Sequence, residues 1–216
     1  MRESPRIRRL RSDRNLLETL RSHSSILDFV IPHERPPNPP DVYILRFRGQ
    51  GLWRPPGTEE VLLREFHEVH VRLGASYPRM MPELLWKTPI FHPNISASGV
   101  VCLGGYAAHW VPSLTLDELC VMLWDVVRYE NFDIASPYNR EAAFWAKGQD
   151  PEHFPVDPRP LRDRLAGVAP DNVPAKPPVV ARPQPHLASD VQFVVAEEIL
   201  DAEIVEAEST DILYIE

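Results

Sequence analysis

The chain of 216 residues contains only two cysteines, Cys102 and Cys120. So few cysteines exclude a disulfide framework and favour a reducing cytoplasm as the setting. No apolar run approaches the roughly 20 residues that a membrane span needs. The Arg-rich N-terminus also lacks the apolar segment of a signal peptide. These absences predict a cytoplasmic protein without a membrane partner.

Lysine and arginine are absent from residue 190 onward, where nine Asp or Glu residues fall. The rest of the chain carries 22 acidic and 23 basic residues, so the net charge of −8 comes from the tail. A near-neutral body argues against general binding to nucleic acid. Residues 190–216 are acidic and β-branched, and we expect a tail that is disordered alone and that could order on a partner.

Proline is abundant, with 24 residues, and ten of them lie between residues 151 and 185. Such a density is typical of a linker. We therefore expect one domain over residues 1–150, a Pro-rich linker over 151–189 and the acidic tail over 190–216.

The first part of the chain predicts one helix and four strands. Ser4 can cap a helix over residues 4–22, and Pro5 suits its first turn. The arginines of this helix fit either a solvated face or a docking surface for an acidic partner. Short β-type runs follow at 25–31, 42–47, 69–73 and 84–86. Four strands with short links favour an antiparallel meander.

Two further helices are predicted after the strands. Thr115 and Glu118 have the spacing of a capping box. The helix that they open places Cys120 on its apolar face, so we expect Cys120 to be an ordinary core residue. A shorter helix is expected over residues 139–147.

The pattern around Cys102 indicates chemistry. Cys102 lies eight residues after Asn94, the last residue of His92-Pro93-Asn94, and eight residues before Trp110. A thiolate beside an Asn on a Pro-stiffened turn suits covalent acyl transfer. The thiolate can carry an acyl group, and the Asn amide can donate to a developing oxyanion.

These residues resemble the ubiquitin-conjugating enzyme family. The family's Tyr-Pro-x-x-Pro-Pro segment corresponds to residues 77–82, its His-Pro-Asn to 92–94 and its Trp-x-Pro-x-Leu-Thr to 110–115. Residues 136–143 are similar to the segment that opens a later family helix. The resemblance extends from the first helix to Lys147 and is loose over residues 23–65.

The resemblance implies a fold and a role for each site residue. The fold is the α+β ubiquitin-conjugating fold: an N-terminal helix, a four-stranded antiparallel meander, an active-site loop and C-terminal helices. Cys102 matches the position that accepts ubiquitin or a ubiquitin-like protein as a thioester. Asn94 matches a residue that orders the loop and stabilises the oxyanion, and His92 matches one whose role is mainly structural. Ser136 falls where the family has a Ser or Asp that lines the path of the incoming lysine, and the nearby Asp133 could share that role.

The implied activity is that of a carrier enzyme. An activating enzyme, which uses ATP, passes the modifier to Cys102, and a lysine amine then takes it. The carrier itself needs no cofactor. The Arg-rich first helix would dock the activating enzyme. A ligase or a protein that binds the tail would be a further partner.

Other interpretations remain open at this point. Cys102 could be a buried core thiol, could work with His92 as in a thiol hydrolase, or could join His92 and His109 in a zinc site. No paired ligand spacing supports the zinc site. The domain could also be an inactive ubiquitin-conjugating-like scaffold that binds a partner.

The chain departs from the family pattern near the predicted site. Arg79 replaces an apolar residue after Tyr-Pro, and Ser113 follows the Pro of the second ligase-contact loop, which argues against an ordinary RING ligase. Met81 replaces a proline. Gly104 and Gly105 predict a wider groove for the tail of the modifier. Together the departures favour a divergent or prokaryotic ubiquitin-like pathway.

Overall fold

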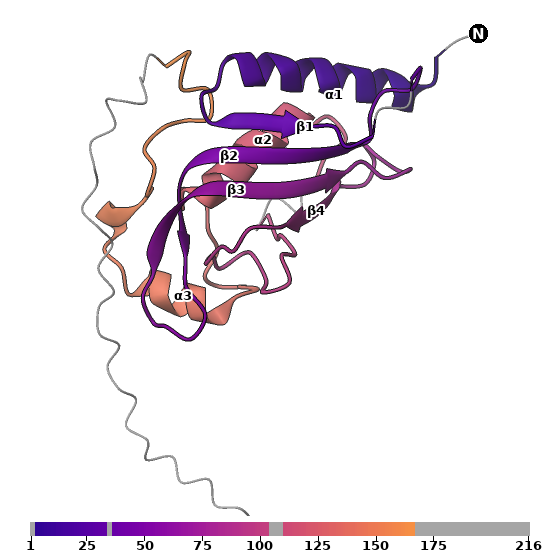
Figure 1. Ribbon diagram of the computed structural model, residues 1–216. Helices are drawn as coiled ribbons and strands as arrows, with labels where there is room; N and C mark the ends of the chain where they lie inside the picture. Colours follow the sequence, from indigo (N-terminus) through magenta and orange to yellow (C-terminus); the bar gives the residue numbers. More distant parts are fainter. Residues whose placement is uncertain (1–2, 34–35, 104–109, 167–216) are drawn as a thin grey trace, which may run out of the picture. The chain divides into compact units, whose positions relative to one another are not determined.

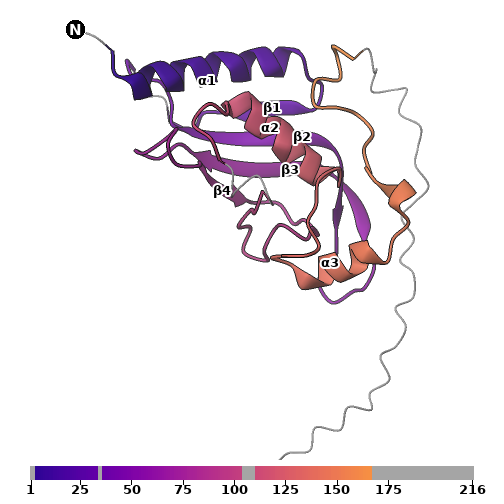
Figure 2. The ribbon, with the colours of Figure 1, turned by 180° about the vertical axis from the view of Figure 1, so that it is seen from behind.

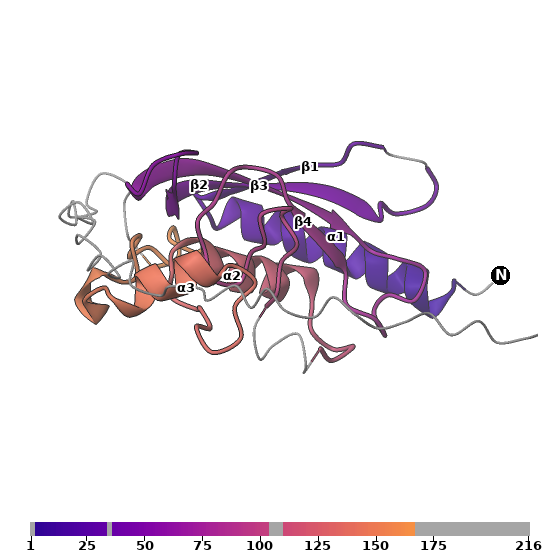
Figure 3. The same ribbon diagram turned by 90° about the horizontal axis from the view of Figure 1, so that it is seen from below.

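The computed structural model of the chain describes residues 3–33, 36–103 and 110–166. Their helices pack on one face of a four-stranded antiparallel sheet (Figure 1; Figure 3 shows the sheet edge-on). The elements in chain order are α1 (Pro5–Ser22), β1 (Leu27–Val30), β2 (Val42–Trp53), β3 (Leu62–Arg72), β4 (Glu83–Trp86), α2 (Leu116–Val127), α3 (Arg140–Lys147) and the 3-10 helix η2 (Pro151–His153). The predicted α+β class is confirmed.

The helices begin where their capping residues predict. Ser4 Oγ accepts a hydrogen bond from the N–H of Ile7, and Asn139 Oδ1 accepts one from Ala142 at 3.0 Å. At α2 the capping box is present, with Glu118 accepting from the backbone of Thr115 at 2.7 Å. These bonds satisfy N–H groups that the first turn of a helix leaves without partners.

The sheet has the strand order β1-β2-β3-β4, as the meander predicts. Its inner face alternates regularly, and Tyr43, Leu45 and Phe47 of β2 are fully buried. Both central strands run further than their apolar patterns indicate. The register shifts between Arg48 and Gly51, so β2 carries a bulge there before it continues to Trp53. The charged and glycine residues at this bulge hid the second half of the strand.

Helix α2 supplies the other side of the core (Figure 2). Leu119, Cys120, Leu123 and Trp124 are fully buried, and the Trp124 ring stacks on Phe47 with centroids 6.2 Å apart. Each such side chain contributes about 1.5–3 kcal/mol by leaving water. Cys120 is the core residue that its helix face predicted, and burial raises the pKa of its thiol.

Helix α1 is fastened by a carboxylate that the sequence did not single out. Asp13 is fully buried and accepts hydrogen bonds from Arg9 Nε at 2.8 Å, Tyr77 OH at 2.7 Å and Leu116 N at 3.2 Å. Arg9 also donates to the carbonyls of Pro112 and Leu114. The Arg9 side chain therefore packs into the fold. The sequence suggests either a solvated face or a docking surface for the arginines of this helix, and Arg9 fits neither.

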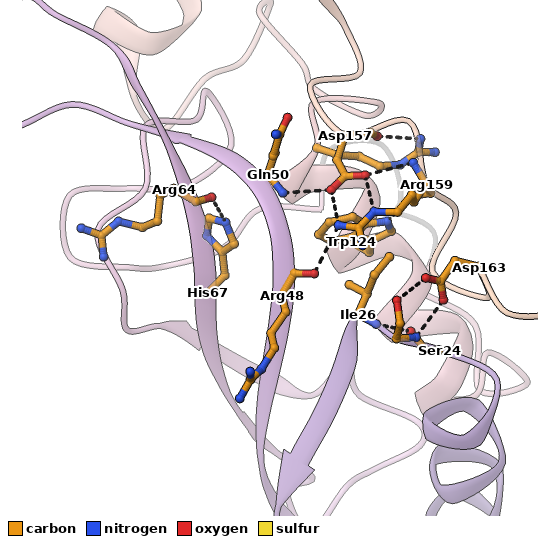
Figure 4. Close-up of polar contacts among 12 residues, drawn as sticks. Ser24, Ile26, Arg48, Gln50, Arg64, His67, Trp124, Asp157, Arg159 and Asp163 are labelled. Atoms are coloured by element: carbon orange, nitrogen blue, oxygen red, sulfur yellow. Dashed lines mark hydrogen bonds and ion pairs between the residues drawn. The ribbon is translucent and has the colours of Figure 1, made fainter. Parts of the chain in front are cut away.

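The segment after α3 differs from the expected linker. Residues 154–166, which we name the strap, pack along the domain (orange in Figure 1; Figure 4). The Asp157 carboxylate accepts a hydrogen bond at 2.9 Å from the N–H of Gln50, which lies at the bulge of β2. Trp124 Nε1 donates to the carbonyl of Arg159 at 2.8 Å. Buried backbone groups must find partners, and the strap supplies them. Residues 167–189 and 190–216 lie outside the described residues.

Gly49 shows how closely the strap approaches the sheet. A Cβ at this position would lie 2.7 Å from Asp157 Oδ2 and 2.8 Å from Arg159 Nη2. Only a glycine leaves room for the strap at the bulge. Further along, Asp163 is fully buried and accepts from the N–H of Ser25 at 2.8 Å.

Within the described residues, no helix is long and apolar enough to cross a bilayer.

The Asp157 carboxylate should be important for stability. Its hydrogen bonds with Arg159 hold its pKa below the ordinary range, despite a burial that acts in the opposite sense. We expect Asp157→Ala to lower the free energy of unfolding by about 3 kcal/mol, because it strands a largely buried guanidinium. Urea unfolding measures this change. Asp41→Ala is the matched control, because the exposed Asp41 pairs with Arg6 at 3.5 Å. This substitution should lower the free energy of unfolding by less than about 1 kcal/mol. Equal losses would contradict the role of the strap.

Stability should also depend on pH through His67 on β3. Burial lowers the pKa of His67 to about 4 from an ordinary 6.5. Between these values the unfolded chain binds a proton that the folded chain refuses, so the free energy of unfolding falls as the pH falls through this window. Between pH 7 and pH 5 we expect the free energy of unfolding of the wild type to fall by about 2 kcal/mol more than that of the His67→Gln variant. Parallel curves for the two proteins in urea unfolding would refute this assignment.

Candidate functional site

A short hairpin places Cys102 opposite Asn94. Ile95 and Val101 pair in an isolated antiparallel bridge, and the turn between them ends at Gly99, whose φ is +84°. A Cβ at Gly99 would collide with the carbonyl of Trp86, so this turn requires glycine. The pair next to the bridge is Asn94 and Cys102, and the Cys102 N–H donates to the Asn94 carbonyl at 2.8 Å.

The two cysteines differ in their access to solvent. Cys102 is half-buried at the end of the hairpin, whereas Cys120 is fully buried in α2. The interpretation of Cys102 as a closed core thiol therefore loses its support. A reagent or an acyl donor can approach Cys102 and not Cys120.

Asn94 joins the hairpin to a second loop. Its side-chain oxygen accepts the N–H of Asp133 at 2.8 Å, and its backbone N–H donates to His92 Nδ1 at 3.0 Å. The side chain is 2% exposed, and its amide nitrogen is buried with no hydrogen-bond partner among the described residues. A buried donor without a protein partner is costly, and a water molecule or a group that enters the site can satisfy it.

His92 is enclosed by the fold. Its side chain is fully buried, and its ring lies edge-on to Tyr129 with centroids 4.5 Å apart. Burial lowers the pKa of His92 to about 3, so the imidazole is neutral at physiological pH. Its position supports the predicted structural role and disfavours a protease-like general base. Tyr129 OH donates to the carbonyl of Phe91, which fixes the ring beneath His92.

The loop that carries Asp133 and Ser136 is anchored at both ends near the hairpin. Asn94 holds the N–H of Asp133, and the carbonyl of Pro93 accepts the N–H groups of Tyr138 at 2.8 Å and Asn139 at 2.9 Å. Asp133 Oδ1 accepts the N–H of Ala135 at 2.7 Å. Ser136 is exposed. The structure thus brings Cys102, Asn94, Asp133 and Ser136 to one region, with His92 behind them.

The zinc alternative involves a residue outside the described part of the chain. Among the described residues, no group of three or more His, Cys, Asp or Glu side chains could hold a metal ion. His109, the third ligand of the zinc alternative, and Gly104-Gly105 lie outside the described residues.

Comparison with known proteins points to a family for this site. Residues 56–156, which include the hairpin, Cys102 and the loop of Asp133, match the family model described as ubiquitin-conjugating enzyme. The match covers 101 of the 216 residues, and it supports the resemblance to the ubiquitin-conjugating enzyme family that the motifs indicate.

One curated relative in this family is the protein named Ubiquitin-conjugating enzyme E2 16 from Schizosaccharomyces pombe. It is 36% identical over 77 residues, which are 35% of this chain and 46% of the relative. The matching part thus spans about half the length of that relative. A crystal structure of a Plasmodium yoelii protein described as a ubiquitin conjugating enzyme overlaps with 69% of this chain and 88% of its own, at 20% identity and a TM-score of 0.49.

Two features of this domain escaped sequence reasoning. Gly99 could have been found, because a glycine at the end of a short polar turn indicates a positive φ. Tyr129 could not, since its φ of 61° and its contact with His92 depend on packing. Tyr77 and Trp110 pack against each other, and Trp110 Nε1 donates to the carbonyl of Pro78 at 2.8 Å.

Proposed function

We propose that this protein is a carrier enzyme, which accepts ubiquitin or a ubiquitin-like protein as a thioester on Cys102 and transfers it to a lysine amine. The observation that carries the proposal is the position of Asn94. Its carbonyl accepts the N–H of Cys102, its side-chain oxygen accepts the N–H of Asp133, and its amide nitrogen has no hydrogen-bond partner among the described residues. Acyl transfer needs such a donor near the reacting carbonyl.

Two transfers make up the reaction. In loading, Cys102 Sγ attacks the C-terminal acyl carbon of the modifier and displaces the thiol of an activating enzyme, which has used ATP to form that thioester. In discharge, a lysine nitrogen attacks the same carbon, the carbonyl oxygen becomes an oxyanion, and Cys102 leaves as a thiolate. Asn94 Nδ2 would donate to the oxyanion in the second transfer. The chain itself needs no cofactor for either step.

Asp133 and Ser136 would act on the lysine. An incoming ammonium must lose its proton and its water before it attacks. Asp133 Oδ1 accepts a hydrogen bond from the N–H of Ala135, which shapes the loop. Asp133 Oδ2 accepts no hydrogen bond from the described residues. That oxygen and the exposed Ser136 hydroxyl can orient the amine. The proposed roles of both residues rest on this placement and on the family resemblance.

The partners follow from the activity. They are the modifier, the activating enzyme and an acceptor protein, with a ligase or a tail-binding protein as further candidates. Helix α1 keeps the exposed Arg8 and Arg11 for docking the activating enzyme, whereas Arg9 is committed to the fold. A free thiol at Cys102 suits the reducing cytoplasm that the cysteine content predicts.

A non-catalytic scaffold is the second candidate, because a resemblance to the family does not by itself require activity. The half-buried Cys102 and the unpartnered Asn94 amide fit the enzyme, which would use both. A thiol hydrolase would need a base that takes the proton of Cys102. Burial lowers the pKa of His92 to about 3, which makes its imidazole a weak proton acceptor.

The deciding test is the intact mass of the protein recovered from its own source without reductant. Wild type should carry a small-protein adduct that thiols release, and Cys102→Ser should carry the same adduct as a thiol-resistant ester. Cys120→Ser is the matched control and should keep the thiol-labile adduct. If no adduct forms although the activating enzyme is present, the scaffold is correct. If only the free acid of the modifier accumulates, the protein is a hydrolase.

Asn94→Ala separates the two roles of Asn94. Loss of an oxyanion donor should slow discharge by about 10²–10³-fold, with a much smaller effect on loading. The thioester is discharged with hydroxylamine, which needs no acceptor loop, and with free lysine. If Asn94 stabilises the oxyanion, Asn94→Ala slows discharge with hydroxylamine and with lysine. If Asn94 only holds Asp133, the variant slows discharge with lysine alone. Equal slowing of loading and discharge would exclude the oxyanion role. Asn139→Ala, which removes a helix cap, controls for lost stability.

A further inference from the structure

An open cleft of about 350 Å³ lies beside the loop that carries Asp133. Its walls are largely apolar and come from Tyr129, Phe132, Ile134, Phe154 and two prolines of the 151–155 segment. Lys147 and Gln149, at and just beyond the end of α3, contribute polar groups. None of the functions assigned above uses this cleft.

The cleft shares a wall with the proposed path of the lysine. Phe132 and Ile134 flank Asp133 in the chain, and the N–H of Asp133 is held by Asn94 Oδ1 at 2.8 Å. The same short loop therefore presents Asp133 near Cys102 and two apolar side chains to the cleft. A polypeptide whose lysine passes Asp133 and Ser136 must run close to this wall.

The floor of the cleft is rigid and aromatic. Tyr129 stacks on Phe154 with centroids 5.0 Å apart and an angle of 13° between the rings, and Phe132 lies edge-on to Phe154 at 5.3 Å. Tyr129 holds a φ of 61°, which is unfavourable for a bulky residue and persists only where the surroundings enforce it. A preformed aromatic surface binds another aromatic or aliphatic side chain without first having to be ordered.

Ile134 indicates that the cleft is not closed by the chain's own described residues. Its side chain is 41% exposed at the rim, although it is apolar and follows directly after Asp133. Lys147 is exposed and can move aside, whereas the Gln149 amide donates to the carbonyl of Trp145 at 3.2 Å.

We propose that this cleft binds an apolar side chain, preferably aromatic, of the acceptor protein, a few residues away from the lysine that attacks the thioester. The inference rests on the proposed carrier function and names the acceptor class that this function would serve. The cleft acts as a specificity site, because it holds the acceptor beside Asp133 and takes no part in the bond changes. The enzyme would thus select lysines by a neighbouring apolar residue.

The test uses full-length enzyme loaded with its modifier at Cys102. Discharge is measured by intact mass against free lysine and against short peptides with one central Lys in a Gly/Ser/Ala background. In a series of these peptides, Phe replaces Ala at each position in turn. Burial of one aromatic side chain should accelerate discharge about tenfold at one position or at a few neighbouring ones. If Phe accelerates discharge at no position, the proposal is wrong.

A blocking variant then locates the preference. Gln149→Trp places an indole at the cleft and should reduce the ratio of Phe-peptide to free-lysine rates from about tenfold to about one. Leu165→Trp is the matched control, since Leu165 is 63% exposed on the strap and does not line the cleft. It should keep the full ratio. If Gln149→Trp lowers the thermal midpoint, Lys147→Trp serves as the second blocking variant.

The possible outcomes are distinguishable. If both blocking variants keep the wild-type ratio, the cleft does not bind the acceptor and the inference is overturned. If they slow free lysine and every peptide alike, the cleft serves the modifier or the loop, which also overturns it. If no thioester forms on Cys102 at all, the proposed function fails first, and that failure appears at the loading step before any acceptor is added.

Discussion

Asn94 connects the two segments on which the candidate site depends. Its carbonyl takes the N–H of Cys102, and its side-chain oxygen takes the N–H of Asp133. Both bonds are formed by a residue that is almost fully buried, where a lost hydrogen bond is not replaced by one to water. The hairpin and the loop that carries Asp133 therefore cannot move apart without an energetic cost.

The aromatic residues beneath this junction make it rigid. Tyr129 contacts His92 on one side and Phe154 on the other, and its hydroxyl is bound to the carbonyl of Phe91. The unfavourable φ of Tyr129 is tolerated because these contacts determine its position. A single residue thus links the support of the His-Pro-Asn turn with the floor of the cleft, so the proposed chemistry and the proposed acceptor site share one scaffold.

Buried carboxylates fasten the outer segments to the core. Asp13 ties α1 to Tyr77 and to the start of α2, and Asp157 and Asp163 tie the strap to the bulge of β2 and to Ser25. Each carboxylate accepts several hydrogen bonds, which offsets the cost of removing its charge from water. The domain consequently extends beyond the predicted boundary at residue 150, because the strap satisfies donors of the sheet and of α2.

Features that depend on neighbours along the chain could be predicted from the amino-acid order alone. Period-two alternation indicated the strands, Ser4, Thr115 and Asn139 marked the helix starts, and motif spacing selected Cys102 and its companions. These signals are local, and propensity and capping act over a few residues. The later half of β2 was missed because its bulge interrupts the alternation.

Which distant groups meet depends on how whole elements pack in three dimensions. Asn94 finds Asp133 39 residues further on, and Asp157 finds Gln50 across 107 residues. Neither contact leaves a periodic trace, since each depends on where whole elements pack. The burial that makes His92 neutral, the inward turn of Arg9 and the positive φ of Tyr129 have the same origin. Local chemistry thus identified the candidate residues, and long-range packing set the geometry and the environment in which they lie.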